Sequence, residues 1–258
     1  MNTRLQQQYL DAMGIVRWVP RRGADAGSTE KVINQAAPPN VSGSAIEPSL
    51  VFPASMESDG VPSAWKELES AVRTCTKCPL HATRTQTVFG VGNRNARWMF
   101  IGEAPGADED RQGEPFVGRA GQLLNAMLFA MGLKRGDVYI ANVLKCRPPG
   151  NRDPQPEEVA QCEPYLSRQI DLIHPALIVA LGRHAAHSLL KTEAPLARLR
   201  GQRLSYHGAP LIVTYHPAYL LRNPADKRKA WDDLRLAKSI MDKCGRDAAT
   251  PDLRMGKS

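Results

Sequence analysis

Residues 97–131 read RWMFIGEAPGADEDRQGEPFVGRAGQLLNAMLFAM, a stretch that contains a strand, a loop and a helix in succession. The first six residues are an apolar run of strand length, and the last twelve have the apolar spacing of a helix. Similar strand-like runs lie at 137–142, 176–182 and 210–215, and helical patterns cover 156–173, 183–190 and 226–243. Strands that alternate with helices predict an α/β fold, a three-layer α/β/α domain around a mainly parallel, four-stranded sheet.

The segments on either side of this alternation differ from it in composition. Residues 23–63 are dominated by Ala, Gly, Ser, Pro and Asn, which cannot bury enough apolar surface to offset their ordering entropy, so we predict a flexible linker. We expect a folded domain at 64–244 and a disordered tail at 245–258. Residues 1–22 place apolar side chains before a basic patch, a pattern typical of a partner-docking peptide.

Charge is distributed unevenly along the 258 residues. Residues 1–63 have a net charge of −1 and residues 64–258 a net charge of +9. The positive part favours a polyanionic partner such as nucleic acid. The chain has no apolar run near the roughly 20 residues that cross a bilayer, and its N-terminus lacks the apolar stretch of a secretory signal. We therefore expect a cytoplasmic protein without a membrane partner.

Four of the five cysteines form two groups. Cys75 and Cys78 have the C-x-x-C spacing that lets two thiolates bind one metal centre, and Cys146 and Cys162 are the only plausible second pair. In a reducing compartment such cysteines are more often metal ligands or buried residues than disulfides. Zinc and a 4Fe-4S cluster both accept four cysteines, and the spacing leaves both open. Cys244 stands apart from the two groups.

Unusual residues follow each predicted strand, at the edge where open α/β sheets bind ligands. A long Gly- and Pro-rich loop follows the first strand, Asn142 and Cys146 follow the second, and Arg183 follows the third. The segment YHPAYLLRNP follows the fourth. These polar strand ends together predict a binding site at this edge.

The motifs CTKCPL, GEAPGADEDRQGEPFVGRAG, NVLKCRPPGNRDPQPEEVAQCEPYL, LGRHAA and HPAYLLRNP occur in this order. Together they resemble the family 4 uracil-DNA glycosylases, the iron–sulfur branch of their superfamily, over residues 64–243. The resemblance implies hydrolytic excision of uracil from single- or double-stranded DNA in base excision repair. It also implies a 4Fe-4S cluster, with zinc as the second choice, on Cys75, Cys78, Cys146 and Cys162.

Base excision requires a pocket that holds a base flipped out of the stack. Phe116 suits stacking against that base, and Asn142 offers an acceptor and a donor that tell uracil from cytosine. The loop that begins at Gly102, Glu103 and Ala104 resembles the uracil-contacting motif of the family.

Bond cleavage leaves negative charge on uracil and positive charge on the sugar. His216 matches the histidine of the family that donates to uracil O2, and Glu103 is the preferred carboxylate near the sugar or water, with Glu109 as runner-up. Other families of the superfamily have Asp where this chain has Ala104, which leaves the water-activating group open. Tyr219 and Leu220 are expected to fill the vacated stack, and Arg222 to contact phosphate.

The alternative function is a non-catalytic or covalent uracil-DNA binding protein of the same superfamily. Residues 1–22 resemble the N-terminal peptide of the clamp-loader psi subunit, which docks onto the chi subunit, so we expect docking to chi. We further expect a monomer in a bacterial cytoplasm, associated with the nucleoid.

Overall fold

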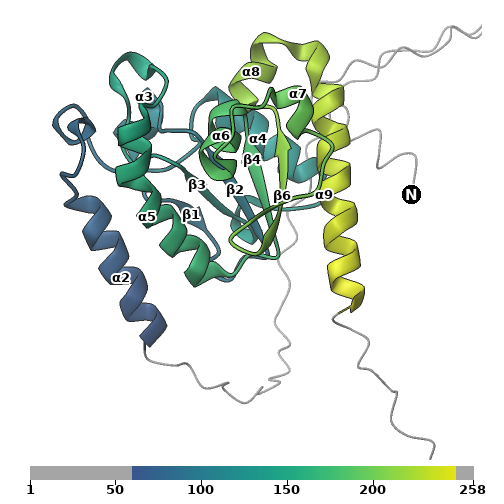
Figure 1. Ribbon diagram of the computed structural model, residues 1–258, viewed down its shortest axis with the longest axis horizontal. Coiled ribbons are helices and arrows are strands. Elements are labelled where there is room, and N and C mark those ends of the chain that lie inside the picture. The colour runs from purple at the N-terminus through teal and green to yellow at the C-terminus, as the bar shows by residue number, and fades with distance from the viewer. Residues whose placement is uncertain (1–59, 248–258) are drawn as a thin grey trace, which may run out of the picture. The chain divides into compact units, whose positions relative to one another are not determined.

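The structure is a computed structural model, and it describes residues 60–247, with side chains described for 63–243 (Figure 1). The predicted docking peptide at 1–22, most of the predicted linker at 23–63 and the end of the predicted tail lie outside these residues. Helix α2 (Gly60–Arg73) begins inside the predicted linker, and α9 (Lys227–Asp247) ends three residues beyond the predicted domain end at 244. The ordered elements therefore extend slightly past the predicted boundaries at both ends.

The centre of the domain is a six-stranded sheet in the order β1-β3-β2-β4-β6-β5. The four inner strands are parallel: β3 (Tyr139–Asn142), β2 (Trp98–Gly102), β4 (Leu177–Leu181) and β6 (Ala209–Thr214). These are the four strands that the sequence predicts. The edge strands β1 (Val91–Gly92) and β5 (Leu204–Tyr206) pair antiparallel, and the four-stranded prediction misses both.

Helices follow the predicted patterns wherever those patterns are long. The predicted segments correspond to α4 (Arg119–Ala130), α5 (Pro156–Ile173), α6 (Arg183–Leu190) and α9. The sequence does not predict three shorter helices: α3 (Ala107–Gln112), α7 (Leu196–Leu199) and α8 (Pro217–Arg222). Short 3₁₀ turns lie at Pro79–Ala82, Arg135–Asp137, Pro149–Asn151 and Pro224–Asp226.

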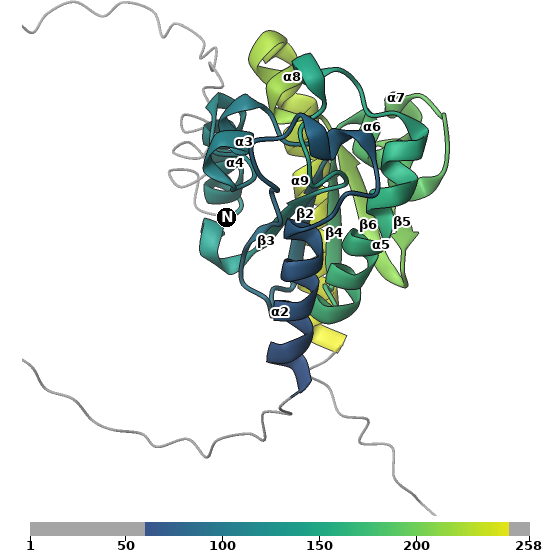
Figure 2. The ribbon, with the colours of Figure 1, turned by 90° about the vertical axis from the view of Figure 1, so that its left-hand side faces the viewer.

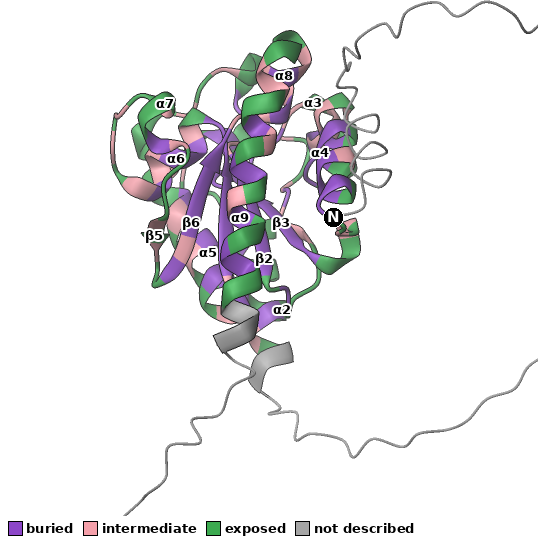
Figure 3. Ribbon diagram, turned by 90° about the vertical axis from the view of Figure 1, so that its right-hand side faces the viewer, coloured by how far each residue is buried: buried purple, intermediate pink, exposed green. Residues whose placement is uncertain are grey.

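Helices cover both faces of the sheet (Figures 1 and 2). Successive strand residues point to opposite faces, so Phe100 packs with α4 and α9, whereas Met99 and Ile101 pack with α2, α5 and α6. Every residue of β2, β3 and β4 is buried, as parallel strands between two helical layers require (Figure 3). The described helices include none long and apolar enough to cross a membrane.

The strand register sets the position of the site. Gly102 pairs with Asn142 across β2 and β3, and Leu181 pairs with Thr214 across β4 and β6. Parallel strands bring their carboxyl ends to one edge, so the residues that follow these four strands lie close together.

Candidate active site

Four predicted residues meet at the carboxyl ends of the strands, and we refer to them as the strand-end cluster: Gly102, Phe116, Asn142 and His216. A Cβ added to Gly102 would lie 2.4 Å from Oδ1 of Asn142 and 2.7 Å from Cζ of Phe116. The rings of Phe116 and His216 are 5.6 Å apart between centroids. The position of Gly102 therefore requires glycine, because any side chain would fill the space between the amide and the ring.

Asn142 has a buried polar atom without a partner. Asn142 is 2% exposed, and its Oδ1 accepts no hydrogen bond from the residues that the structure describes. A buried acceptor left unpaired costs about 1–3 kcal/mol. An acceptor held at that cost beside an aromatic ring is suited to bind the N–H edge of a planar ligand.

His216 is held as a neutral imidazole. Its Nδ1 accepts a hydrogen bond of 3.1 Å from the backbone N–H of Ala218, at the start of α8. Burial, which has the largest effect, and the positive charges of Arg222 and His184 together lower the pKa of His216 to about 4. Because Nδ1 is an acceptor in the neutral ring, the proton is on Nε2. The side chain therefore offers one N–H donor at neutral pH.

Glu109 braces the loop that carries Phe116. Its Oε2 accepts from the backbone N–H of Gly106 at 3.1 Å, and its Oε1 accepts from Val117 and Gly118 at 3.0 and 3.2 Å. Both carboxylate oxygens are therefore occupied by the loop itself. Phe116 has a φ of 55°, a strained value for an aromatic residue, and these bonds help to hold it. This arrangement assigns Glu109 to loop geometry, whereas the sequence suggests it as the second candidate for the catalytic carboxylate.

Glu103 follows β2 and is half-buried. Burial raises the pKa of Glu103 to about 7, with Asp153 raising it and Arg183 lowering it. Asp153 lies in the proline-rich loop before α5, where its Oδ2 is 3.3 Å from Nε2 of His184 and 3.9 Å from Nη2 of Arg183. Glu103 can therefore exchange a proton near neutral pH, a property suited to general acid–base chemistry. Ala104, the next residue, is also half-buried and packs against the cysteine-containing core.

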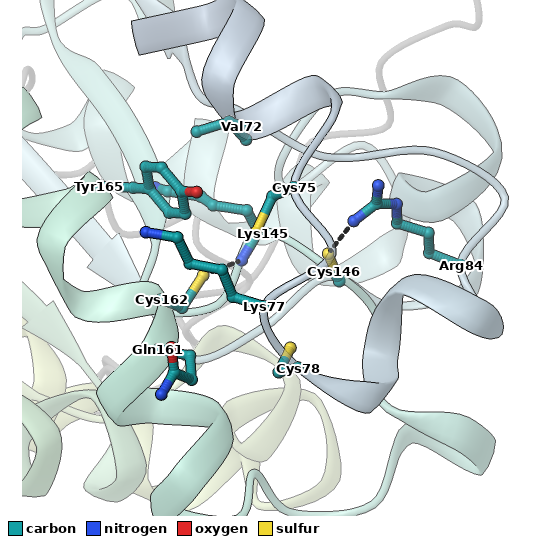
Figure 4. A pocket seen from close by; sticks show the side chains of 10 residues that line it. All are labelled: Val72, Cys75, Lys77, Cys78, Arg84, Lys145, Cys146, Gln161, Cys162 and Tyr165. Atoms are coloured by element: carbon teal, nitrogen blue, oxygen red, sulfur yellow. Dashed lines mark hydrogen bonds between the residues drawn. The ribbon is translucent and has the colours of Figure 1, made fainter.

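The four predicted metal ligands line one pocket (Figure 4). Cys146 and Cys162 are buried, Cys75 and Cys78 are half-buried, and all four are free thiols. Cys162 comes from α5, and Cys146 from the loop after β3. Two donors point at sulfur: Nη1 of Arg84 lies 3.1 Å from Sγ of Cys146, and the backbone N–H of Lys145 lies 3.2 Å from Sγ of Cys162.

Four cysteine thiols are a donor set that a zinc ion and a 4Fe-4S cluster both accept. Within residues 63–243, no three His, Cys, Asp or Glu side chains are grouped closely enough to hold a metal ion. A single zinc, with Zn–S bonds of about 2.3 Å, would need four tightly grouped sulfurs. A four-iron cluster binds each cysteine through a different iron, so its ligands stand farther apart. Burial raises the pKa of Cys162 to about 11, so binding as a thiolate would displace a proton.

Comparison of the sequence with known proteins identifies the family of this chain. A family model described as the uracil DNA glycosylase superfamily matches residues 89–235. A type-4 uracil-DNA glycosylase of Thermotoga maritima is 46% identical over 178 residues, which cover 67% of this chain and 93% of the relative. The chain belongs to the type-4 uracil-DNA glycosylase family. The type-4 enzyme of Archaeoglobus fulgidus is 47% identical over 187 residues, 69% of this chain and 92% of the relative.

A more distant relative is a type-5 uracil-DNA glycosylase of Pyrobaculum aerophilum. It is 36% identical over 146 residues, which cover 50% of this chain and 64% of the relative. The Thermotoga maritima and Archaeoglobus fulgidus relatives are matched over more than nine-tenths of their own length, whereas this type-5 relative is matched over about two thirds of its length.

In this family member, the segment after β6 is helical. Leu220 of α8 is 1% exposed and packs in the core below the helix, so it does not face outward in this conformation. Tyr219 stacks on Tyr215 at 5.1 Å and donates from its hydroxyl to Oδ2 of Asp226 at 2.7 Å. Arg222, at the end of α8, is exposed. Among the three predicted DNA contacts, Arg222 is the one that is freely accessible.

Sequence reasoning missed two buried polar residues next to the site. Lys145 is 1% exposed, and Gln169, on α5, is fully buried. Burial lowers the pKa of Lys145 and the neighbouring Cys162 raises it, with a net value of about 8. The one available signal is the position of Lys145 between the apolar pair Val143 and Leu144 and the predicted ligand Cys146.

Proposed function

We propose that this chain hydrolyses the N-glycosidic bond of deoxyuridine in DNA, which releases uracil and leaves an abasic site for base excision repair. The observation that carries the proposal is the buried, unpaired Oδ1 of Asn142, which faces the Phe116 ring and the bare backbone of Gly102. The comparisons support the same reaction, because the matched relatives are named uracil-DNA glycosylases.

Uracil recognition is assigned to the strand-end cluster. The base, flipped out of the stack, stacks on Phe116. Oδ1 of Asn142 accepts from N3–H of uracil, which cytosine lacks. The backbone of Gly102, Glu103 and Ala104 completes the contacts on the strand side. With uracil bound, the N3–H donates to the otherwise unpaired Oδ1 of Asn142. With cytosine, which has no hydrogen on N3, this oxygen would stay unpaired, so the site favours uracil.

Cleavage is assigned to His216 and Glu103. The neutral His216 donates from Nε2 to uracil O2 as negative charge develops there. Removal of a single donor of this type typically lowers kcat by about 10²–10³-fold. Glu103, as a carboxylate, stabilises the positive sugar or takes a proton from the attacking water. Glu109 supports this chemistry from the loop, because its oxygens bind backbone amides.

DNA contacts are assigned to the end of α8. Arg222 is exposed and lies where it can pair with a phosphate. Tyr219 lies beside it at the rim. Leu220 can fill the vacated stack only if α8 moves away from the core, because its side chain is now buried under that helix.

The cofactor is assigned as a 4Fe-4S cluster on Cys75, Cys78, Cys146 and Cys162. When bound, the cluster links the segment before β1 to the loop and helix after β3. The four cysteines that line one pocket and the two N–H···S contacts support a thiolate-bound group, and the resemblance to the iron–sulfur family favours a cluster over zinc. Iron content together with visible absorption tests this assignment, and stoichiometric zinc without iron would contradict it.

A gel assay of abasic sites tests the proposed function. Wild type, Asn142→Ala and His216→Ala are incubated with a uracil-containing oligonucleotide, and the strand is cleaved by alkali. We expect the wild type to produce abasic sites and each variant to be slower by at least about 100-fold. Equal rates in all three proteins would contradict the residue roles, and no abasic sites with wild type would contradict the function.

Residues 1–22 are proposed as a docking peptide for the clamp-loader chi subunit. The support is the sequence pattern alone, since this segment lies outside the described residues. A pull-down with a peptide of residues 1–22 and purified chi tests it. Failure of the peptide to retain chi would end this part of the proposal without affecting the enzyme assignment.

A further inference from the structure

Lys145 is a buried lysine with no carboxylate partner among the residues that the structure describes. It follows β3, three residues after Asn142 and one before Cys146, and it is 1% exposed. Its Nζ donates to the backbone oxygen of Asn142 at 2.9 Å and to Oε1 of Gln169 at 2.7 Å. Both acceptors are neutral, and no described Asp or Glu lies within ion-pair distance of Nζ. Lysine is rarely buried without an anion, because an uncompensated charge is costly in the interior.

Gln169 fixes the place of this ammonium group. Its Nε2 donates to the backbone oxygen of Phe89 at 2.9 Å and to the hydroxyl of Tyr139 at 3.1 Å, so its Oε1 faces Lys145. The residue is completely buried. Gln169 therefore orients an acceptor toward the ammonium group of Lys145, which lies between α5 and the end of β3.

The cysteine pocket supplies the missing negative charge. The lining of this pocket includes Lys145 together with the four cysteines (Figure 4). The backbone N–H of Lys145 also donates to Sγ of Cys162 at 3.2 Å. Four thiolates that bind a cluster bring negative charge to the side of Lys145, and a low dielectric makes this attraction strong. The side-chain ammonium of the same residue donates to the backbone oxygen of Asn142.

We propose that Lys145 is a positioning residue that couples the cluster site to uracil recognition: its ammonium offsets thiolate charge and fixes the backbone of Asn142. This inference rests on the proposed function and on the proposed cluster. It implies that the cluster and the base-reading amide support each other through one charged side chain. The loop after β3 adds to this coupling, because Leu144 donates its backbone N–H to the oxygen of Glu103 at 3.0 Å.

The test compares Lys145→Met with Lys77→Met. Both changes remove a lysine charge from the lining of the cysteine pocket, but Lys77 is exposed, with Nζ 5.3 Å from the Tyr165 ring centroid. Iron loss to a ferrous chelator is followed by visible absorption. Because partners that support metal ligands typically contribute about 10–100-fold, we expect iron loss to accelerate by that factor in K145M. In K77M we expect a change below about threefold, since solvent screens the exposed charge.

Uracil excision by the same proteins, normalised to iron content, gives a second readout. We expect K145M to have a raised KM and a lower kcat/KM, because Asn142 is less firmly held. Iron loss no faster than in K77M, or a normal kcat/KM per iron, would overturn the proposal. The chelator assay does not depend on turnover, so a wild type that holds iron but releases no uracil would contradict the proposed function and leave this test valid.

A second pair of variants applies if K145M does not accumulate as folded protein. Gln169→Glu keeps an oxygen that accepts from Nζ and places a carboxylate against the ammonium, and Gln169→Met removes all the hydrogen bonds of the Gln169 side chain without adding charge. The proposal predicts faster iron loss in Q169E than in Q169M, because the new carboxylate withdraws the positive charge from the thiolates. Equal rates in the two variants would overturn it.

Discussion

At the residue scale, the site combines groups whose environments are unfavourable without a ligand. Asn142 keeps an unpaired oxygen in the interior, and His216 is neutral because burial and neighbouring positive charge disfavour its charged form. The positions of these residues at strand ends could be predicted from the sequence. The tautomer of His216 could not, because it depends on the N–H of Ala218 at the start of a helix that the sequence does not predict.

Substitution of Gly102 by Ala tests the geometry of the strand-end cluster. The new Cβ would lie 2.4 Å from Oδ1 of Asn142, so the amide and the Phe116 ring must move. A misplacement of about 1 Å can cost about 10²-fold in rate, and we expect a loss of at least that size in kcat/KM. Gly136→Ala is the matched control, because a Cβ there meets nothing within 4 Å. Wild-type activity in G102A would contradict the arrangement.

The pH dependence of activity tests Glu103. Its raised pKa, about 7, means that the carboxylate form is present above that value and is lost as pH falls through it. We expect kcat/KM of the wild type to rise with pH through about 7 and then level off. His216, with a pKa near 4, should add no loss above about pH 5. Glu103→Gln should be slow with a flat profile, and an unchanged rise in this variant would assign the titration to another group.

At the element scale, the sequence predicts those strands and helices that are long enough to show an apolar period. The four inner strands and α4, α5, α6 and α9 are all predicted, because each has an apolar pattern set by a buried face. The edge strands β1 and β5 have two and three residues, too few for a pattern. Helix α8 has six residues, too few for its apolar spacing to predict a helix.

The loop that contains α3 depends on one carboxylate, that of Glu109. Glu109→Gln leaves one oxygen to accept where two now accept from three backbone amides. We expect the loop to loosen and KM to rise by about tenfold, since each lost charge-assisted bond is worth about 1.5–3 kcal/mol and part of it is recovered by the amide. Glu114→Gln, an exposed change in the same loop, is the control. If E109Q instead loses kcat with a normal KM, Glu109 acts in the chemistry and not in loop geometry.

At the scale of the whole molecule, the cysteine pocket ties together segments that are far apart in sequence. The surrounding core joins Leu68 and Val72 of α2 with Leu144 after β3 and Tyr165 of α5. The segment between Cys146 and Cys162 also contains an ion pair of its own. Arg152 makes two hydrogen bonds to Glu158, at 2.9 and 2.5 Å, and these order the loop before α5.

Loss of one cysteine ligand should weaken the domain and remove iron. A group that binds only the folded state stabilises it by linkage, so we expect Cys78→Ser to lower the melting temperature by several degrees, at about 2–4 °C per kcal/mol for a domain of this size. Cys244→Ser, outside the predicted ligand set, should retain iron and wild-type stability. Calorimetry with iron analysis checks both variants. A C78S protein with full iron content would contradict the ligand assignment.

The central claim is that this chain is a turnover enzyme for uracil in DNA. The most direct measurement is the amount of free uracil released per mole of protein from an excess of uracil-containing duplex. The site described here predicts many equivalents, with loss of release in the His216→Ala variant. Release that stops at or below one equivalent, with the protein retained on the DNA, would contradict the claim and favour a stoichiometric uracil-DNA binding protein.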